Sequence, residues 1–409
     1  MSKKNFFFLL VFVPFFLYTG CNKNSKIASL KEEKLFTLHY GMFENELRIP
    51  TEKEEEFKKS SIYMEDGMFY IEDSVAKKIM LFSSYGDLVQ VIYNKDTNPT
   101  PSFVANQPSE LSDENIEIVT QKAVEYPFTN LGSLTADRQK NLYVVDNLPP
   151  ERYKEKDSIF LRQVVLRFKA DGTFIDYLGQ EGPGGTPFPY IQNLYTTSND
   201  ELIIVCRTLT GFSVYWYTTE GFLKYTIPLD TDKLPRLKID ENITQYVSLT
   251  QIVPDSNDEK LYLKIDYQVS ERDLSSNVES GIEFKETALY PLDVTTGKYE
   301  SPLIIPPFEE TETIGYTKTI HKLAYDFLGV TDSGWFFFSI GDATGYSILM
   351  VQPNGQRVIS KHLNVDQQQT LSQPFCLSRK GILSAMLVTN KEATICWWRT
   401  DNIIASFLK

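Results

Sequence analysis

Short runs rich in Val, Ile, Tyr, Phe and Trp alternate with tight-turn dipeptides along most of this chain. Such alternation is typical of consecutive β-hairpins, because Gly, Asn and Asp adopt the positive φ that tight turns require. The turns occur in pairs, and the two members of a pair are separated by 19, 31, 21, 39, 21 and 21 residues. The six pairs are Asp66-Gly67 and Tyr85-Gly86, Lys140-Asn141 and Asp171-Gly172, Asn199-Asp200 and Glu220-Gly221, Asn257-Asp258 and Thr296-Gly297, Ser333-Gly334 and Asn354-Gly355, and Lys380-Gly381 and Asp401-Asn402.

Each pair of turns implies one unit of four antiparallel strands, which in the first unit are 61–65, 68–72, 78–82 and 88–93. A single four-stranded meander cannot bury both of its faces, whereas six meanders arranged around an axis can. We therefore predict an all-β, six-bladed β-propeller with four-stranded antiparallel blades. A two-sheet sandwich is the competing fold, but it rarely carries so many strands at such even spacing. The predicted blades cover residues 60–93, 126–178, 190–228, 246–305, 321–363 and 371–409.

Residues 21–59 precede the first predicted blade. The stretch 23–34 is polar and charged and indicates a tether, whereas 35–40 and 47–49 look like strand fragments. Because 403–408 is expected to be the fourth strand of the sixth blade, the strand fragments should either lie over the seam of the ring or add an outer strand.

Two strand cores carry a resemblance to a known repeat. Asn141-Leu142-Tyr143-Val144-Val145-Asp146 and Met68-Phe69-Tyr70-Ile71-Glu72-Asp73 resemble the core of NHL-type propeller repeats. The Gly-rich stretch from Gly179 to Phe188 resembles the segment that links one NHL blade to the next. The whole chain is also similar to an uncharacterised bacterial family of propeller lipoproteins. That resemblance implies a fold and a location in the cell but no activity.

The first 20 residues resemble a lipoprotein signal peptide. Lys3 and Lys4 precede a 13-residue apolar run, and Tyr18-Thr19-Gly20-Cys21 resembles a lipobox, although Tyr18 stands where most such signals have Leu. The resemblance implies cleavage between Gly20 and Cys21 and acylation of Cys21. The apolar run is too short to span a bilayer core about 30 Å thick, so we expect attachment through the acyl chains.

The residue after Cys21 bears on which membrane the protein is expected to be attached to. Asn22 is not the Asp of a common inner-membrane retention signal, which favours the outer membrane of a bacterial cell envelope. The body then faces either the periplasm or the exterior.

The net charge of the chain limits the classes of partner that it could bind. The net charge is −13, and loss of Lys3 and Lys4 with the signal makes it −15, which disfavours nucleic acid as a partner.

Once Cys21 is acylated, Cys206, Cys376 and Cys396 are the remaining cysteines. We expect them to be buried free thiols, since the strands of Cys376 and Cys396 should have another strand between them.

Strand direction alternates, so the two tight turns of every blade should lie on one face of the ring. All the large insertions fall in the other loops and should therefore lie on the opposite face; they are 94–125, 147–158, 229–245, 268–284 and 306–320. Loops on a rigid scaffold commonly carry binding, so this face is the candidate recognition surface for a protein or peptide. The alternative is that the face merely tolerates longer loops.

Four carboxylates close the second strand of their blades near this face: Asp73, Asp146, Asp266 and Asp342. A ring of them could hold Ca²⁺, which takes several oxygen ligands. The stronger alternative is that each accepts hydrogen bonds from nearby backbone N–H groups. We therefore expect no resident metal or cofactor, with Ca²⁺ as the one ion that the arrangement would suit.

Catalytic signals are scarce. The chain has no G-x-S-x-G or H-E-x-x-H motif, and His39, His321 and His362 should not converge. The innermost strands offer only Glu65 to the central channel, and we expect most of the Trp and Tyr residues to be core. We therefore favour a binding or scaffold module without catalytic residues. The alternative is a metal-dependent hydrolase or lactonase on the same fold.

Overall fold

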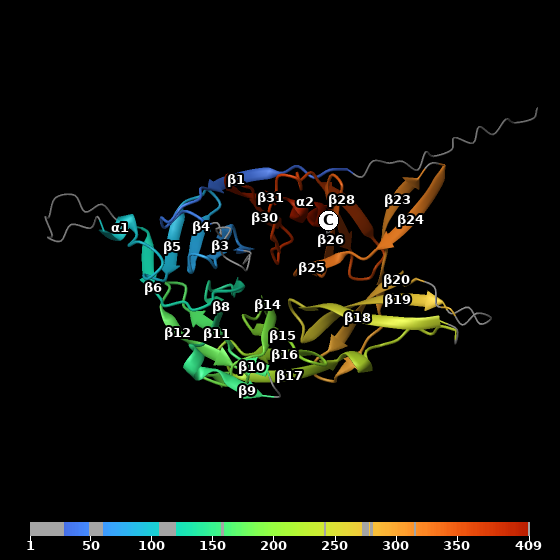
Figure 1. The fold of residues 1–409 in the computed structure, drawn as a ribbon, viewed down its shortest axis with the longest axis horizontal. Helices are drawn as coiled ribbons and strands as arrows, with labels where there is room; N and C mark the ends of the chain where they lie inside the picture. Colours follow the sequence, from blue (N-terminus) through green and yellow to red (C-terminus); the bar gives the residue numbers. More distant parts are fainter. Residues whose placement is uncertain are drawn as a thin grey trace, which may run out of the picture.

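The computed structural model describes residues 28–48, 60–105, 120–156, 159–240, 243–271, 278, 281–314 and 316–407. Six sheets of four or five strands stand around a central axis, so the predicted all-β, six-bladed propeller is confirmed (Figure 1). The sheets are antiparallel except where an added strand runs parallel to its neighbour in the first blade. In these ranges, no helix has the length and apolar character needed to cross a bilayer.

The first three blades follow one another along the chain, each from its innermost strand outward. Blade 1 consists of β2 (Ser61–Glu65), β3 (Met68–Asp73), β4 (Lys78–Ser83), β5 (Leu88–Tyr93) and β6 (Lys122–Glu125). Blade 2 consists of β7 (Leu134–Ala136), β8 (Leu142–Asn147), β11 (Gln163–Phe168), β12 (Phe174–Gly179) and β13 (Gly182–Pro183). Blade 3 consists of β14 (Tyr190–Thr196), β15 (Leu202–Arg207), β16 (Gly211–Tyr217) and β17 (Leu223–Asp230).

The other three blades complete the ring. Blade 4 consists of β18 (Ile243–Pro254), β19 (Lys260–Glu271) and β20 (Glu283–Asp293), with β21 (Lys298–Tyr299) and β22 (Leu303–Ile305) both paired to β20. Blade 5 consists of β25 (Asp326–Val330), β26 (Phe336–Asp342), β27 (Gly345–Val351) and β28 (Val358–Leu363). Blade 6 consists of β29 (Phe375–Leu377), β30 (Leu383–Val388), β31 (Ala393–Trp398) and β1 (Glu33–Leu38).

The fourth strand of blade 6 comes from the other end of the chain. We expected it over 403–408, but this prediction is wrong, because Thr400–Phe407 forms helix α2. The edge of β31 is already occupied by β1, which runs antiparallel to it, and the Trp397 indole Nε1 donates to Glu33 at 2.8 Å. The pre-blade segment therefore adds an outer strand, which was one of the two arrangements expected for it.

Among the described residues, the core consists of six apolar clusters, and each lies between two neighbouring blades. Strand β15 shows how: Ile203 and Val205 face blade 4, whereas Ile204 and Cys206 face blade 2. Successive strand residues point to opposite faces, so a strand that is apolar throughout must be covered on both sides. Each blade satisfies this requirement only through its two neighbours.

Eleven of the twelve predicted turns connect strands as expected, and only Asp401-Asn402 lies in α2 instead. The eleven define one face of the ring, which we call the turn face. The loops between second and third strands and the links between blades define the opposite loop face. The turn residues do take positive φ at ten of these turns, as at Gly67 and Gly86.

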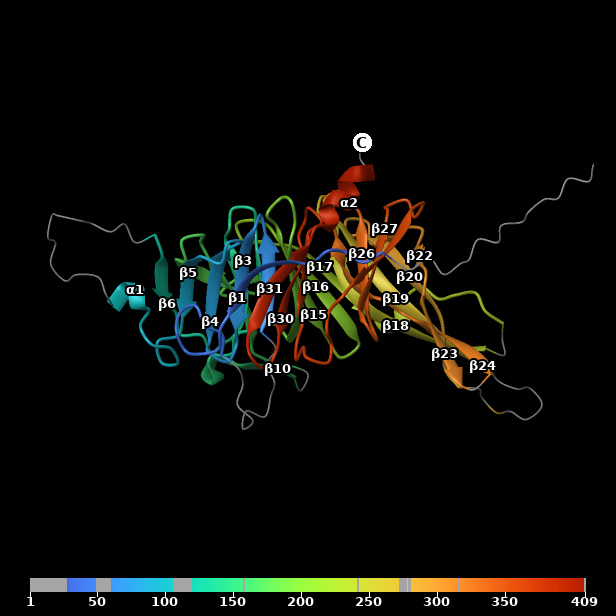
Figure 2. The same cartoon turned by 90° about the horizontal axis from the view of Figure 1, so that it is seen from above.

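The described segments that project as strands from the propeller body lie on the loop face (Figure 2). They are the hairpin of β9 (Lys154–Lys156) and β10 (Ile159–Leu161), the far ends of β18 and β19, and the hairpin of β23 (Phe308–Ile314) and β24 (Thr317–Leu323). Helix α2 lies on the turn face, and the short helix α1 (Ser102–Ala105) lies between β5 and β6 of blade 1 in the chain. Two 3₁₀ turns, Pro150–Arg152 and Thr231–Lys233, complete the described elements.

Candidate functional site

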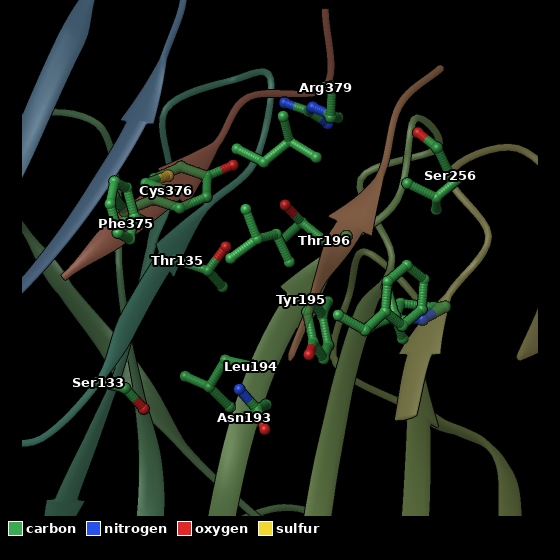
Figure 3. Close-up of a pocket in the computed structure, with 18 of the residues that line it drawn as sticks. Ser133, Thr135, Asn193, Leu194, Tyr195, Thr196, Ser256, Phe375, Cys376 and Arg379 are labelled. Carbon is green, nitrogen blue, oxygen red and sulfur yellow. The ribbon is translucent and has the colours of Figure 1, made fainter. Parts of the chain in front are cut away.

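A cavity of about 500 Å³ occupies the centre of the ring. Residues from the innermost strand of every blade line it, so it is the central channel of the propeller. Figure 3 shows Arg379 at one end of the cavity and Ser133 and Asn193 toward the other. Because Arg379 follows β29 and Ser133 precedes β7, the first end is the turn face and the second is the loop face.

At the turn face, hydrogen bonds join each blade to the next around the whole ring. They are Tyr63 Oη to Ala136 O (2.9 Å), Arg138 N to Asp200 Oδ1 (2.9 Å), Ser198 N to Ser256 O (2.7 Å), Ser256 Oγ to Asp332 Oδ1, Asp332 N to Arg379 O (2.8 Å) and Arg379 Nε to Glu65 Oε2 (3.2 Å). This cyclic network forms a floor to the channel on the turn side.

Arg379 crosses the floor. Its Nε donates to Glu65 of blade 1, and its Nη1 donates to the carbonyl of Thr197 at 3.0 Å in blade 3, on the far side of the ring from blade 6. Burial raises the pKa of the Glu65 carboxyl, although the charge and hydrogen bonds of Arg379 oppose the shift. The pair is almost entirely buried, so it is the charged centre of the site.

The channel wall is more polar than the sequence predicted. We expected Glu65 alone from the innermost strands, but Gln192, Asn193 and Gln251 also line the cavity. Strand β14 has a register shift between Ile191 and Asn193, and β18 has one beside Gln251. At a bulge the alternation of faces is interrupted, so Gln192 and Asn193 both reach the channel.

Cys206, Cys376 and Cys396 are buried free thiols, as predicted. Cys376 lines the channel, but its Sγ accepts from the backbone N–H of Met64 at 3.2 Å, and burial raises the pKa of the thiol to about 12. At neutral pH the group is therefore protonated and a poor nucleophile. Cys376 and Cys396 lie on β29 and β31, with β30 between them.

The structure does not bring Asp73, Asp146, Asp266 and Asp342 together into one ligand set. Each accepts hydrogen bonds from groups near it in the fold. The donors to Asp73 are the N–H groups of Arg48 and Ala76; those to Asp146 are the N–H groups of Thr129, Asn130 and Asn147; those to Asp342 are Thr344 and Ser347. Burial raises the pKa of Asp73 and of Asp146.

Asp266 belongs to a buried polar cluster inside blade 4. It accepts from Lys264 Nζ at 2.5 Å and from the hydroxyls of Thr250 and Thr287, while Lys264 is only 2% exposed. The strands β18, β19 and β20 thus each supply one partner. In the part of the chain that the structure describes, no group of three His, Cys, Asp or Glu side chains is placed to hold a metal ion.

The histidines lie apart on the loop-face side of the fold. His39 follows β1, His321 lies in β24 beside Glu312, and His362 lies in β28 beside Asp342. Trp216, Trp335 and Trp398 are core residues, as expected, whereas Tyr190 and Tyr316 are exposed. The proposed cleavage and lipidation residues, Gly20 and Cys21, lie outside the described residues.

No family model and no curated protein matches this chain. Solved structures similar to it include a gluconolactonase from Xanthomonas campestris (11% identity, TM-score 0.40, covering 91% of this chain and 96% of that one). A streptogramin B lyase is also similar, with 11% identity and a TM-score of 0.36 over 90% of this chain and 96% of that one. The calcium-binding protein regucalcin from Agrobacterium tumefaciens has 10% identity and a TM-score of 0.39 over 90% of this chain and 94% of that one. At this level of similarity no residue role in this chain follows from them.

The buried pair in blade 4 gives a direct test of the role of Asp266. Asp266→Ala should lower the free energy of unfolding by about 3–5 kcal/mol, because Lys264 would remain buried without its charged partner. Denaturant unfolding measures this, with Asp232→Ala at an exposed site as the control. A double variant, Lys264→Met with Asp266→Leu, should recover most of the loss. An Asp266→Ala protein as stable as the control would contradict the structural role.

Proposed function

We propose that this chain is a lipid-anchored binding protein of the bacterial cell envelope, which recognises an extended segment of a protein partner through its loop face. The observation that carries the proposal is the asymmetry of the two faces. Apart from helix α2, the described part of the turn face consists of short turns tied together by the cyclic network. The hairpins and strand extensions leave the body on the opposite face.

The β23–β24 hairpin is an accessible part of that face. In the described ranges its strands pair only with one another, so each offers an unpaired edge, and every residue of β24 is exposed. A two-stranded ribbon that buries neither face is marginally stable alone. Free strand edges are the sites where extended peptides add a further strand, with main-chain hydrogen bonds giving affinity.

The side chains of the hairpin suit a peptide with mixed polar and apolar character. Ile320 and Leu323 are exposed apolar residues on β24, and Tyr316 lies at the tip. Glu309 lies opposite Lys322 in the register and Glu310 opposite His321, so the ribbon carries both signs of charge. Because these opposite charges largely cancel, the hairpin would exert little electrostatic attraction on a partner. Recognition would then rest on backbone pairing and apolar contact.

Photo-crosslinking in cells tests the loop face with a matched pair of positions. Tyr316 on the hairpin and Tyr85 on the turn face are both highly exposed, at 108% and 88%. A photoreactive residue at position 316 should capture one defined protein, and the same residue at position 85 should not. Replacing 309–322 by a short Gly-Ser linker should abolish capture from a neighbouring loop-face position. The melting temperature of this variant should stay within about 2 °C of that of the natural protein, since the described side chains of the hairpin bury almost nothing. Equal capture from both faces would overturn the proposal.

The anchor has its own test. Cys21→Ser should move the protein from the membrane fraction to the soluble fraction, because no acyl chain could then be attached. Metabolic labelling with a fatty acid should mark the natural protein and not the variant. A membrane-bound Cys21→Ser protein would contradict lipid anchoring.

A second candidate function is a hydrolase or lactonase that acts within the channel. The observation that favours it is Glu65, a carboxyl of raised pKa that lines the cavity beside Arg379. Such a group is suited to proton transfer, since its pKa moves toward the working pH. Among the described residues, no group of three His, Cys, Asp or Glu side chains is placed to hold a metal ion, so the structure offers no support for a metal-dependent version.

Glu65→Gln separates the two candidates. If the channel is catalytic, hydrolysis of ester or lactone substrates should fall at least about 100-fold in this variant, as expected on loss of a general acid or base. The pH profile of the natural protein should show an ionisation above the ordinary range for Glu. Absence of turnover by the natural protein across a broad substrate panel would remove this candidate and leave the binding function standing.

A further inference from the structure

The geometry points to the floor of the central channel as a binding site for a neutral saccharide of one or two rings. This site is separate from the loop-face contact with a protein partner. A cavity of about 500 Å³ lies within the range of small-molecule sites, about 300–1,000 Å³. The buried Arg379 lies at its turn-face end, and Ser133 and Asn193 lie toward its loop-face end (Figure 3).

Three side chains of the channel wall carry a polar atom that is buried and has no hydrogen-bond partner. They are Arg379 Nη2, Thr135 Oγ1 and Gln192 Oε1, from blades 6, 2 and 3. Arg379 is 9% exposed and Thr135 is 1% exposed. An unsatisfied buried donor or acceptor costs about 1–3 kcal/mol. Three such atoms beside one cavity therefore favour a ligand that can form hydrogen bonds with them.

The charges around the floor select against an anion. Glu65 offsets the guanidinium of Arg379, and Asp332 adds a further negative charge close by. Asp255 also lines the cavity and is held by its own turn and by Tyr262 Oη. A carboxylate or phosphate ligand would therefore meet repulsion, whereas a hydroxyl or ether oxygen can accept from Nη2 without it.

The rest of the wall offers neutral donors, acceptors and apolar rings. Ser133 and Asn193 supply hydrogen-bonding groups nearer the loop face, and Tyr195 and Phe327 supply aromatic surface. Sugars present hydroxyls around their edges and C–H groups on their faces, so a wall that mixes amides, hydroxyls and rings suits them. A charged sugar acid of the same size would fit the cavity volume, but the carboxylates near the floor would repel it.

Calorimetry and thermal unfolding of the detergent-solubilised full-length protein test the site with a panel of neutral mono- and disaccharides and the matching uronic acids. At least one neutral sugar should bind and raise the melting temperature with rising concentration. Its uronic acid should bind at least about 10-fold more weakly, which is about 1.4 kcal/mol.

Thr135→Val is the decisive variant, because it removes an unpartnered hydroxyl with little change in shape. It should weaken sugar binding at least about 5-fold while leaving the melting temperature of the free protein unchanged or higher. Thr226→Val, on an exposed strand position, should leave sugar affinity as it is. The site is overturned if no neutral sugar binds, if the uronic acid binds as tightly, or if Thr135→Val binds unchanged. The sugar-binding result does not depend on the crosslinking experiment, so a failure to capture a protein from position 316 would not contradict this site.

Discussion

The structure depends on blades that are apolar on both faces. A strand such as β15, which is buried from Leu202 to Cys206, cannot rest against one neighbour and water, so each blade requires a blade on either side. Closure follows from this requirement, and the last seam forms only when β1 completes blade 6 and Leu38 joins the cluster shared with blade 1. The cyclic network at the turn face is the polar counterpart of the same closure.

Closure also explains why the two faces differ. The turn-face loops converge near the axis, where short polar side chains bond from blade to blade and Arg379 spans the centre. On the loop face the links must carry the chain from the rim of one blade back to the centre of the next, and this path tolerates extra length. The hairpin of β23 and β24 lies in such a link. A rigid base and a variable rim are therefore built into the same ring.

Much of the fold could be predicted from the sequence, because tight turns need Gly, Asn or Asp and these recur at regular spacing. The predicted strands 61–65 and 88–93 match β2 and β5. The prediction failed at 403–408, where the choice between strand and helix depended on β1, far away in the chain, having taken the edge of β31. It also missed Gln192 and Asn193, since a bulge is invisible to a pattern of strict alternation. The roles of Glu65 and Arg379 depend on their meeting across blades, which no local motif encodes.

The pairing of β1 with β31 has a consequence for biogenesis. Glu33 and Trp397, which meet across this pair, lie 364 residues apart, so the ring stays open until almost the whole chain is available. Such long-range contacts form slowly, and the partly built molecule exposes strand edges and apolar sheet faces in the meantime. A chain of this design that is secreted through a membrane would emerge as an unclosed series of sheets, and chaperones on the far side would need to protect it until its last strand arrives.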